Sequence, residues 1–222
     1  MTHSKSTSSR PSTSRACFAI LGMACAGLAP ARAGAQVHPK VAPLAQIDSL
    51  GAQEKEMLAI ANDFAKRCVA AMERWIANKE TTEEKLFGFL YYPIPDTDPP
   101  MYRTDWDVLA DRDIQPLGDS VLAKSSAIVF AIITDKNGYI PAHNQRYSLP
   151  LTGNKAMDLV NNRTKKIVVH KTALRAQRNE APFLFQRYPR ETGEMMVDLS
   201  VPLNIRGVHW GTVRVGYRQT EN

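Results

Sequence analysis

The stretch AIVFAIITDKNGYIPAHNQRY, residues 127–147, decides the fold of this chain. Its first eight residues, 127–134, are almost all apolar and rich in Ile and Val, which predicts a strand buried on both faces. The segment Asp135-Lys136-Asn137-Gly138 interrupts this pattern, and Gly138 is the residue best able to adopt a positive φ. The chain is therefore expected to reverse there into a second strand, 139–143, and to form a buried hairpin.

The first 35 residues form a leader that differs from the rest of the chain. It contains four basic residues and no acidic residue, and it holds the apolar run ACFAILGMACAGLAP, residues 16–30. This run is shorter than the roughly 20 apolar residues that a membrane span needs. A basic start, a short apolar middle and small residues at the exit are typical of a secretory signal peptide, cleaved after Ala33 or Ala35. We therefore predict a signal peptide at 1–35 and a periplasmic or secreted protein.

Without this leader the charge of the chain is nearly balanced. Four of the 28 Lys and Arg residues lie in the leader and none of the 22 Asp and Glu residues does, so the net charge falls from +6 to +2. No basic patch with interleaved aromatic residues appears, and we expect no nucleic-acid partner. Cys68 is the only cysteine outside the leader, which leaves no partner for an intrachain disulfide.

A linker at residues 36–47 and a long amphipathic helix at residues 48–80 are expected next. Apolar residues recur in the helix at spacings of three and four, which places them on one stripe: Leu50, Met57, Ile60, Ala61, Phe64, Cys68, Ala71, Met72 and Trp75. A helix of this length exceeds what a small sheet covers, so its first half is available to a second copy of the chain. This predicts a homodimer through the 48–80 helix.

Residues 81–222 are expected to form one domain with the first hairpin in its sheet. The prolines between residues 93 and 100 predict irregular structure, and residues 144–182 are polar and loop-like. Short helices are predicted at residues 104–110, 114–124 and 155–161, and further strands at 183–188, 195–203 and 208–217. The result is an α+β fold with a five-stranded antiparallel sheet, an N-terminal helix and a long insertion between strands two and three.

Two glycine-ended connections suggest how the last three strands pair. Residues 190–193 and 204–207 both end in Gly, which is typical of three-residue hairpin loops with a bulge. With such loops Gln186 lies opposite Asp198, and Asp198 lies opposite Arg214. These three residues then form one polar row across the sheet, and the Val-rich opposite face forms the core.

The polar row supplies a candidate ligand site. Arg214 and Asp198 are suited to the carboxylate and the ammonium of a zwitterion, or Arg214 alone to an organic acid. Trp210 on the same face adds an apolar wall with an indole donor, and four further residues complete the predicted site: Gln186, His143, Arg146 and Tyr147. The alternative is an ordinary cross-strand ion pair that stabilises the fold by about 0.2–1 kcal/mol. Both interpretations remain open.

Several motifs between residues 85 and 217 carry a family resemblance. They are TDKNGYIPAHN, RYSLPLTGN, NNRTKK, PFLFQRYPRETGEMMVDLSVPL and HWGTVRVGY. In order and spacing they resemble the Cache and PAS-like sensor region of bacterial methyl-accepting chemotaxis proteins. The resemblance implies a strand order of 2-1-5-4-3, a long N-terminal helix behind one sheet face and a ligand between the other face and the insertion. The chain departs from that family after Tyr217, where five residues stand in place of a membrane helix and a cytoplasmic coiled coil.

We therefore expect a periplasmic sensor that binds an amino acid or an organic acid and signals, as in chemotaxis, through a membrane-bound partner. The sequence contains no HExxH metal motif, no GxSxG nucleophile motif and no phosphate-binding loop, so neither catalysis nor a cofactor is expected. Two alternatives remain open. One is a non-catalytic structural or interaction protein that dimerises through its N-terminal helix, and the other is a sensor with non-covalent haem held by His143 or His170.

Overall fold

The computed structural model of this chain describes residues 44–189 and 194–220. The predicted signal peptide, 1–35, and most of the predicted linker, 36–47, lie outside the described residues. None of the described helices combines the length and the apolar character needed to cross a membrane.

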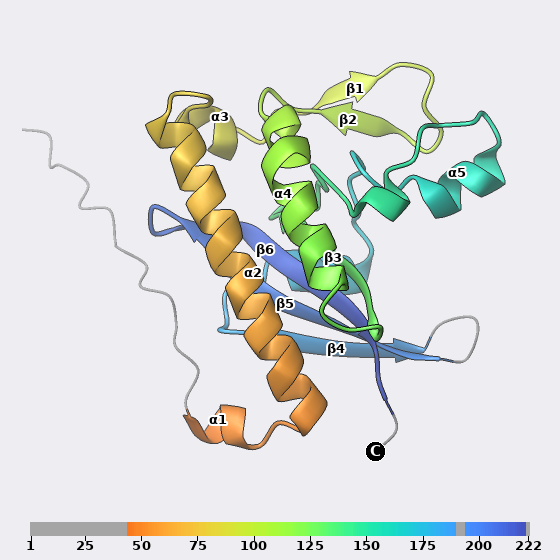
Figure 1. Cartoon of the computed structure of the whole chain (residues 1–222). Helices are drawn as coiled ribbons and strands as arrows, with labels where there is room; N and C mark the ends of the chain where they lie inside the picture. Colours follow the sequence, from red (N-terminus) through yellow and green to blue (C-terminus); the bar gives the residue numbers. More distant parts are fainter. Residues whose placement is uncertain (1–43, 190–193, 221–222) are drawn as a thin grey trace, which may run out of the picture. The chain divides into compact units, whose positions relative to one another are not determined.

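The main sheet is antiparallel and has four strands in the order β3-β6-β5-β4 (Figure 1). Its strands are β3 (Ile128–Asp135), β4 (Leu184–Pro189), β5 (Met195–Ile205) and β6 (Val208–Arg218). Each lies within one or two residues of a predicted strand, and four of the predicted strands are therefore confirmed. A second sheet pairs β1 (Tyr92–Ile94) with β2 (Met101–Arg103), in the proline-containing segment where irregular structure was expected.

The predicted strand 139–143 does not form, so the prediction of a five-stranded sheet was wrong. The chain does reverse at Gly138, whose φ is 94°. Beyond this turn Ile140 exchanges backbone hydrogen bonds with the insertion, because its N–H donates to the Lys166 carbonyl and its carbonyl accepts from Lys165 N–H, at 2.9 and 2.8 Å. Pro141 has no N–H to donate to a sheet. The segment therefore bonds to the insertion instead of extending the sheet beyond β3.

The helices differ from the predictions mainly in their limits. The predicted helix 48–80 corresponds to α2 (Ala52–Ala77), with Gly51 at its N-cap. The end of the predicted linker 36–47 is helical instead, because α1 spans Leu44–Asp48. The two helices predicted at 104–110 and 114–124 are one continuous helix, α4 (Asp107–Leu122). The prediction at 155–161 is confirmed by α5, and the remaining helical segments were not predicted: α3 (Glu83–Phe87), η1 (Gln145–Tyr147) and α6 (Lys171–Gln177).

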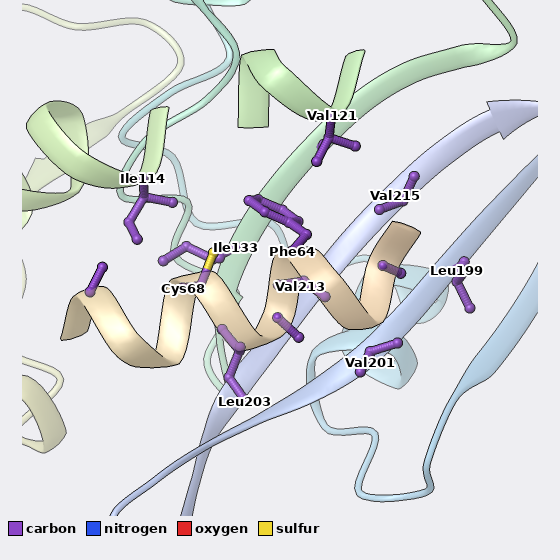
Figure 2. Packing of buried hydrophobic residues seen from close by; sticks show 14 of the residues in the cluster. Phe64, Cys68, Ile114, Val121, Ile133, Leu199, Val201, Leu203, Val213 and Val215 are labelled. Atoms are coloured by element: carbon purple, nitrogen blue, oxygen red, sulfur yellow. The ribbon is translucent and has the colours of Figure 1, made fainter. Parts of the chain in front are cut away.

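The core lies between the main sheet and the helices α2 and α4. Phe64, Cys68 and Trp75 of the apolar stripe are fully buried. The stripe packs against the Val- and Leu-rich face of the sheet that was predicted to be core (Figure 2): Val197, Leu199, Val201, Val213 and Val215.

The first half of α2 is covered by the chain itself. Met57, Leu58 and Ile60 are only 1 to 8% exposed, so the apolar stripe is not available to a second copy. This removes the reason for which the homodimer was predicted, although the homodimer itself stays a prediction.

The pairing of β4 with β5 agrees with the predicted register, with Gln186 opposite Asp198. The pairing of β5 with β6 does not, because Asp198 lies opposite Gly216 and Arg214 lies opposite Ser200. The predicted register of this hairpin was therefore wrong by two residues. Since successive side chains alternate between faces, a shift of two leaves Asp198 and Arg214 on their predicted face. Trp210 lies at the bulge, beyond which the shift is one residue, and its side chain is in the core instead of on the predicted face.

The geometry of the turn explains the shift in register. Arg206 and Gly207 form a two-residue turn with φ values of 50° and 79°, as a type I′ hairpin requires. The bulge lies outside the turn, between Leu203 and Asn204. The predicted three-residue loop, with the extra residue inside the turn, was therefore wrong.

Asp113 on α4 joins this helix to α2. Its carboxylate accepts a hydrogen bond from Trp75 Nε1 at 2.6 Å and another from Arg112 at 2.7 Å. The hydrogen bond from Arg112 makes the largest contribution to lowering the pKa of Asp113, and the bond from Trp75 lowers it further. Together they hold this pKa at about 2, below its usual value of 3.8. The charged form of Asp113 therefore stabilises the fold at neutral pH.

We predict that Asp113→Asn lowers the free energy of unfolding at pH 7 by about 1 kcal/mol, a value reduced for solvent screening. Because the pKa of Asp113 is depressed in the folded state, the stabilisation by its charged carboxylate is complete above the unfolded-state pKa near 3.8. This stabilisation is lost as the pH falls through about 2. Urea unfolding of both proteins between pH 7 and pH 2 measures this. The control Asp98→Asn removes an exposed ion pair with Lys155 and should change little at either pH. An equal loss in both variants would contradict the prediction.

Candidate functional site

A cleft of about 650 Å³ lies between the insertion and the sheet face opposite α2. This volume is within the roughly 300–1,000 Å³ of typical small-molecule sites. The sheet contributes Phe130 and Ile132 from β3, Tyr188 from β4, Asp198 from β5 and Arg214 from β6. The segment after Gly138 contributes most of the remaining wall: Ile140, His143, Leu159, Arg163, Lys166, Val168, His170 and Thr172.

A buried ion pair forms the sheet side of the cleft. Arg214 Nε donates to Asp198 Oδ1 at 3.3 Å, and Arg214 Nη2 donates to Asp198 Oδ2. Asp198 is completely buried and Arg214 is 6% exposed. The two residues are diagonal neighbours in the register, a separation that a long Arg side chain spans easily. The charge of Asp198 is therefore already balanced within the protein.

Phe130 forms the floor of the cleft beside this pair. Its ring lies directly over the Cα of Gly216, where any Cβ would collide with the ring atoms. The Arg214 guanidinium lies 6.0 Å from the centroid of the same ring. Glycine at position 216 thus leaves the space in which Phe130 packs.

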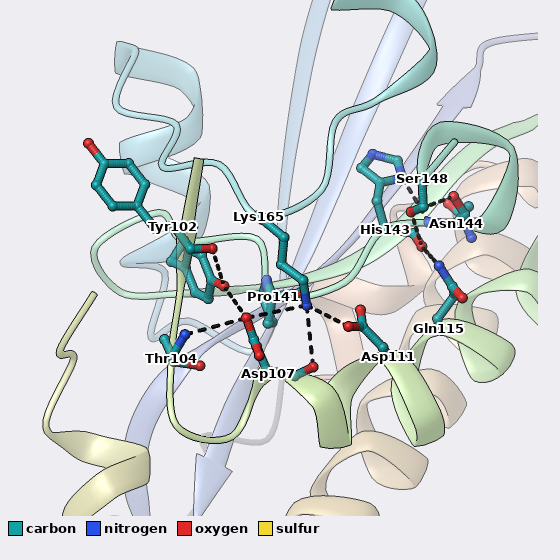
Figure 3. Close-up of polar contacts among 11 residues, drawn as sticks. Tyr102, Thr104, Asp107, Asp111, Gln115, Pro141, His143, Asn144, Ser148 and Lys165 are labelled. Atoms are coloured by element: carbon teal, nitrogen blue, oxygen red, sulfur yellow. Dashed lines mark hydrogen bonds and ion pairs between the residues drawn. The ribbon is translucent and has the colours of Figure 1, made fainter. Parts of the chain in front are cut away.

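The opposite side of the cleft is an extended strap, residues 162–169, which joins α5 to α6. Its backbone is held in the middle and near its C-terminal end, because Tyr102 N–H donates to the Lys165 carbonyl and Val168 N–H donates to the Gly138 carbonyl, at 2.8 and 2.9 Å. The side chains of Lys165 and Lys166 have different surroundings. Lys166 lines the cleft, whereas the Lys165 ammonium is bound by Asp111, at 2.7 Å, and by the Pro141 carbonyl (Figure 3).

The cleft has a positive electrostatic potential. Burial lowers the pKa of His143 to about 3, and the charges of Arg163, Arg146, Arg214 and Lys166 lower it further. Burial and the charge of Arg163 likewise lower the pKa of Lys166. Three cationic side chains thus line the cleft, and Asp198 is the only carboxylate among its described lining residues. An anion entering the cleft would be attracted by this excess of positive charge.

The geometry of the two cleft histidines disfavours iron ligation. His143 Nδ1 accepts a hydrogen bond from Asn144 N–H at 2.8 Å, and His170 Nδ1 accepts one from Ala173 N–H at 3.3 Å. A neutral imidazole whose Nδ1 accepts carries its proton on Nε2, which then has no lone pair for a metal. Among the described residues no group of three His, Cys, Asp or Glu side chains is arranged to hold a metal ion. The haem alternative therefore has no support in this geometry.

Three of the seven predicted site residues, Arg214, Asp198 and His143, line the cleft together. Arg146 and Tyr147 lie behind His143, with the Tyr147 ring 5.0 Å from the imidazole and the Arg146 guanidinium 4.9 Å from the Tyr147 ring. The His143 backbone carbonyl is bound by Gln115, as Figure 3 also shows. These contacts hold the histidine in place from outside the cleft.

The other two predicted residues have structural roles. Gln186 donates its side-chain N–H to the Thr172 carbonyl at 2.9 Å and so holds α6 to β4. Trp210 is fully buried in the core, where its ring lies 5.6 Å from that of Trp106 and its indole N–H donates to the Leu86 carbonyl at 3.1 Å. Neither side chain lines the cleft.

Sequence reasoning did not select Arg163 and Lys166 as site residues. The signal that pointed to them was the basic cluster RTKK, residues 163–166, within an insertion already expected to cover the site. No protein-family model and no curated protein sequence matches this chain. The interpretation of the cleft therefore rests on its own geometry.

We predict that Asp198→Asn lowers the free energy of unfolding by about 3–5 kcal/mol, because it leaves the buried Arg214 charge without its partner. Denaturant unfolding measures the loss. In the double variant Asp198→Asn/Arg214→Gln no charge is left uncompensated, so its loss should be smaller than the sum of the two single losses. Strictly additive losses would show that the two residues are not coupled.

Proposed function

We propose that this protein is a periplasmic, sensor-like protein that binds a small anionic metabolite in the cleft and signals through a membrane-bound partner, as in chemotaxis. The observation that carries the proposal is the charge of the cleft. Arg163, Lys166 and Arg214 line it, and the one lining carboxylate, Asp198, is already paired. A cleft lined by an excess of positive charge raises the local concentration of anions and is typical of an anion-binding site.

The polar groups of the cleft are suited to an organic acid. On the strap, the Arg163 guanidinium lies over the Tyr147 ring and the Lys166 ammonium donates to the Asn162 carbonyl. Neither has a carboxylate partner within ion-pair distance among the described residues, so the charges of both can still attract a ligand. His143 is neutral and presents its Nε2–H as a hydrogen-bond donor. Thr172 adds a hydroxyl group to the same wall. Guanidinium, ammonium and neutral donors together match the oxygens of a carboxylate.

The position of Arg214 suggests how ligand binding in the cleft is signalled to the partner. Arg214 belongs to β6, and the end of β6 is tied to the start of α2, because Gln53 donates to the Arg218 carbonyl at 3.0 Å and accepts from Thr220 N–H at 3.2 Å. The end of β6 and the start of α2 therefore lie together (Figure 1). In this proposal a ligand that packs against Phe130, beside the Arg214–Asp198 pair, alters this junction, which is where the membrane-bound partner docks.

The test is a thermal-shift screen of the protein, purified after export, against amino acids, organic acids, amines and purines. Organic acids should raise the melting temperature, since a ligand at a hundred times its Kd stabilises the folded state by about 2.7 kcal/mol. Arg163→Gln should abolish the shift without unfolding the protein, because Arg163 is exposed.

The matched control is Arg175→Gln, which removes an exposed arginine on α6 that does not line the cleft. It should leave the shift unchanged. If no anion stabilises the protein, or if the two variants respond alike, the proposal fails and a structural or interaction role is favoured instead.

A further inference from the structure

The cleft is lined by both cationic and apolar side chains. The three cations, Arg163, Lys166 and Arg214, occupy part of its wall. Apolar side chains make up much of the rest: Pro99, Phe130, Ile132, Ile140, Leu159 and Val168. A small hydrophilic acid would satisfy the cations and leave the apolar wall exposed to water, which is unfavourable.

We infer that the ligand is a carboxylate with an apolar ring or branched chain and without an α-ammonium group. This inference rests on the proposed function and adds the ligand class. The carboxylate binds Arg163 and Lys166, and the apolar body lies against Phe130 and Leu159. The cleft volume of about 650 Å³ is ample for such a body.

The absence of an α-ammonium group follows from the state of Asp198. This is the only carboxylate among the described lining residues, it is completely buried, and both of its oxygens accept hydrogen bonds from Arg214. An ammonium group would therefore find no free carboxylate and would be repelled by Arg163 and Lys166. The cleft thus discriminates between an acid and the amino acid of the same skeleton.

A substitution of Leu159 on α5 tests the role of the apolar lining residues without disturbing the fold. It lines the cleft, yet it is 45% exposed, so its removal leaves no cavity in the core. It belongs to a loop, residues 148–162, whose ends are joined by hydrogen bonds. Leu149 N–H donates to the Asn161 carbonyl and Arg163 N–H donates to the Tyr147 carbonyl, at 3.2 and 2.8 Å. These bonds use the backbone alone and do not depend on the Leu159 side chain.

The experiment is isothermal titration of the exported protein with four probes: 3-phenylpropanoate, phenylalanine, 2-phenylethylamine and propanoate. The first two differ only in the α-ammonium group, and the first and last only in the ring. We expect 3-phenylpropanoate to bind at least about tenfold more tightly than any of the others. Leu159→Ser should weaken its binding about tenfold, and Arg163→Gln should abolish it.

Each other result has a defined meaning. Equal or tighter binding of phenylalanine overturns the exclusion of the ammonium group, and equal binding of propanoate overturns the role of the apolar wall. If no probe binds but another acid of the screen does, with loss in Arg163→Gln, this inference fails and the proposed function stands. If no anion binds in either experiment, both fail.

Discussion

The packing of α2 on one face of the β5–β6 pair is the constraint on which the other features of this structure depend. The odd-numbered valines and leucines of these strands turn toward α2, and the core that they form with Phe64 and Trp75 is fully buried (Figure 2). Side chains alternate along a strand, so the even-numbered residues outside the bulge at Leu203/Asn204 point to the opposite face. Asp198 and Arg214 are therefore directed away from the core, where charged groups can be paired and used.

The insertion turns this second face into a cleft. Its strap takes the backbone partners that a fifth strand would have used, since Ile140 bonds to Lys165 and Lys166. The Lys165 ammonium then bonds to Asp111 on α4, which secures the strap from outside. One run of basic residues thus supplies both a structural cation and the cations of the cleft. The same sequence that prevents a fifth strand forms one wall of the cleft.

Holding these charges together has an energetic cost. Arg214 is buried and offset by Asp198, while Arg163 and Lys166 have no carboxylate within ion-pair distance among the described residues. Burial lowers the pKa of His143 and of Lys166, and the charge of Arg163 lowers both further. A fold selected only for stability would not gather like charges around a half-enclosed apolar cleft. This excess of positive charge is what supports the proposal that the cleft is a site for an anion.

Much of the fold followed from local patterns in the sequence. The alternation of apolar residues in 195–203 and 208–217 predicted two strands and the correct faces for Asp198 and Arg214, because face depends only on parity along a strand. The spacing of Phe64, Cys68 and Trp75 predicted the buried stripe of α2, because helical periodicity is a local property.

Other features were decided only by the tertiary structure. Three such features depend on which distant segments compete for the same partners. They are the place of the bulge at Leu203/Asn204, the failure of residues 139–143 to join the sheet, and the burial of Trp210 against Trp106. The cationic side of the cleft depends on how the strap crosses the sheet, which brings Arg163 and Lys166 to face Arg214. The periodicity of the sequence carries no information about such contacts between distant segments, since they are set by the balance of hydrogen bonds and packing over the whole fold.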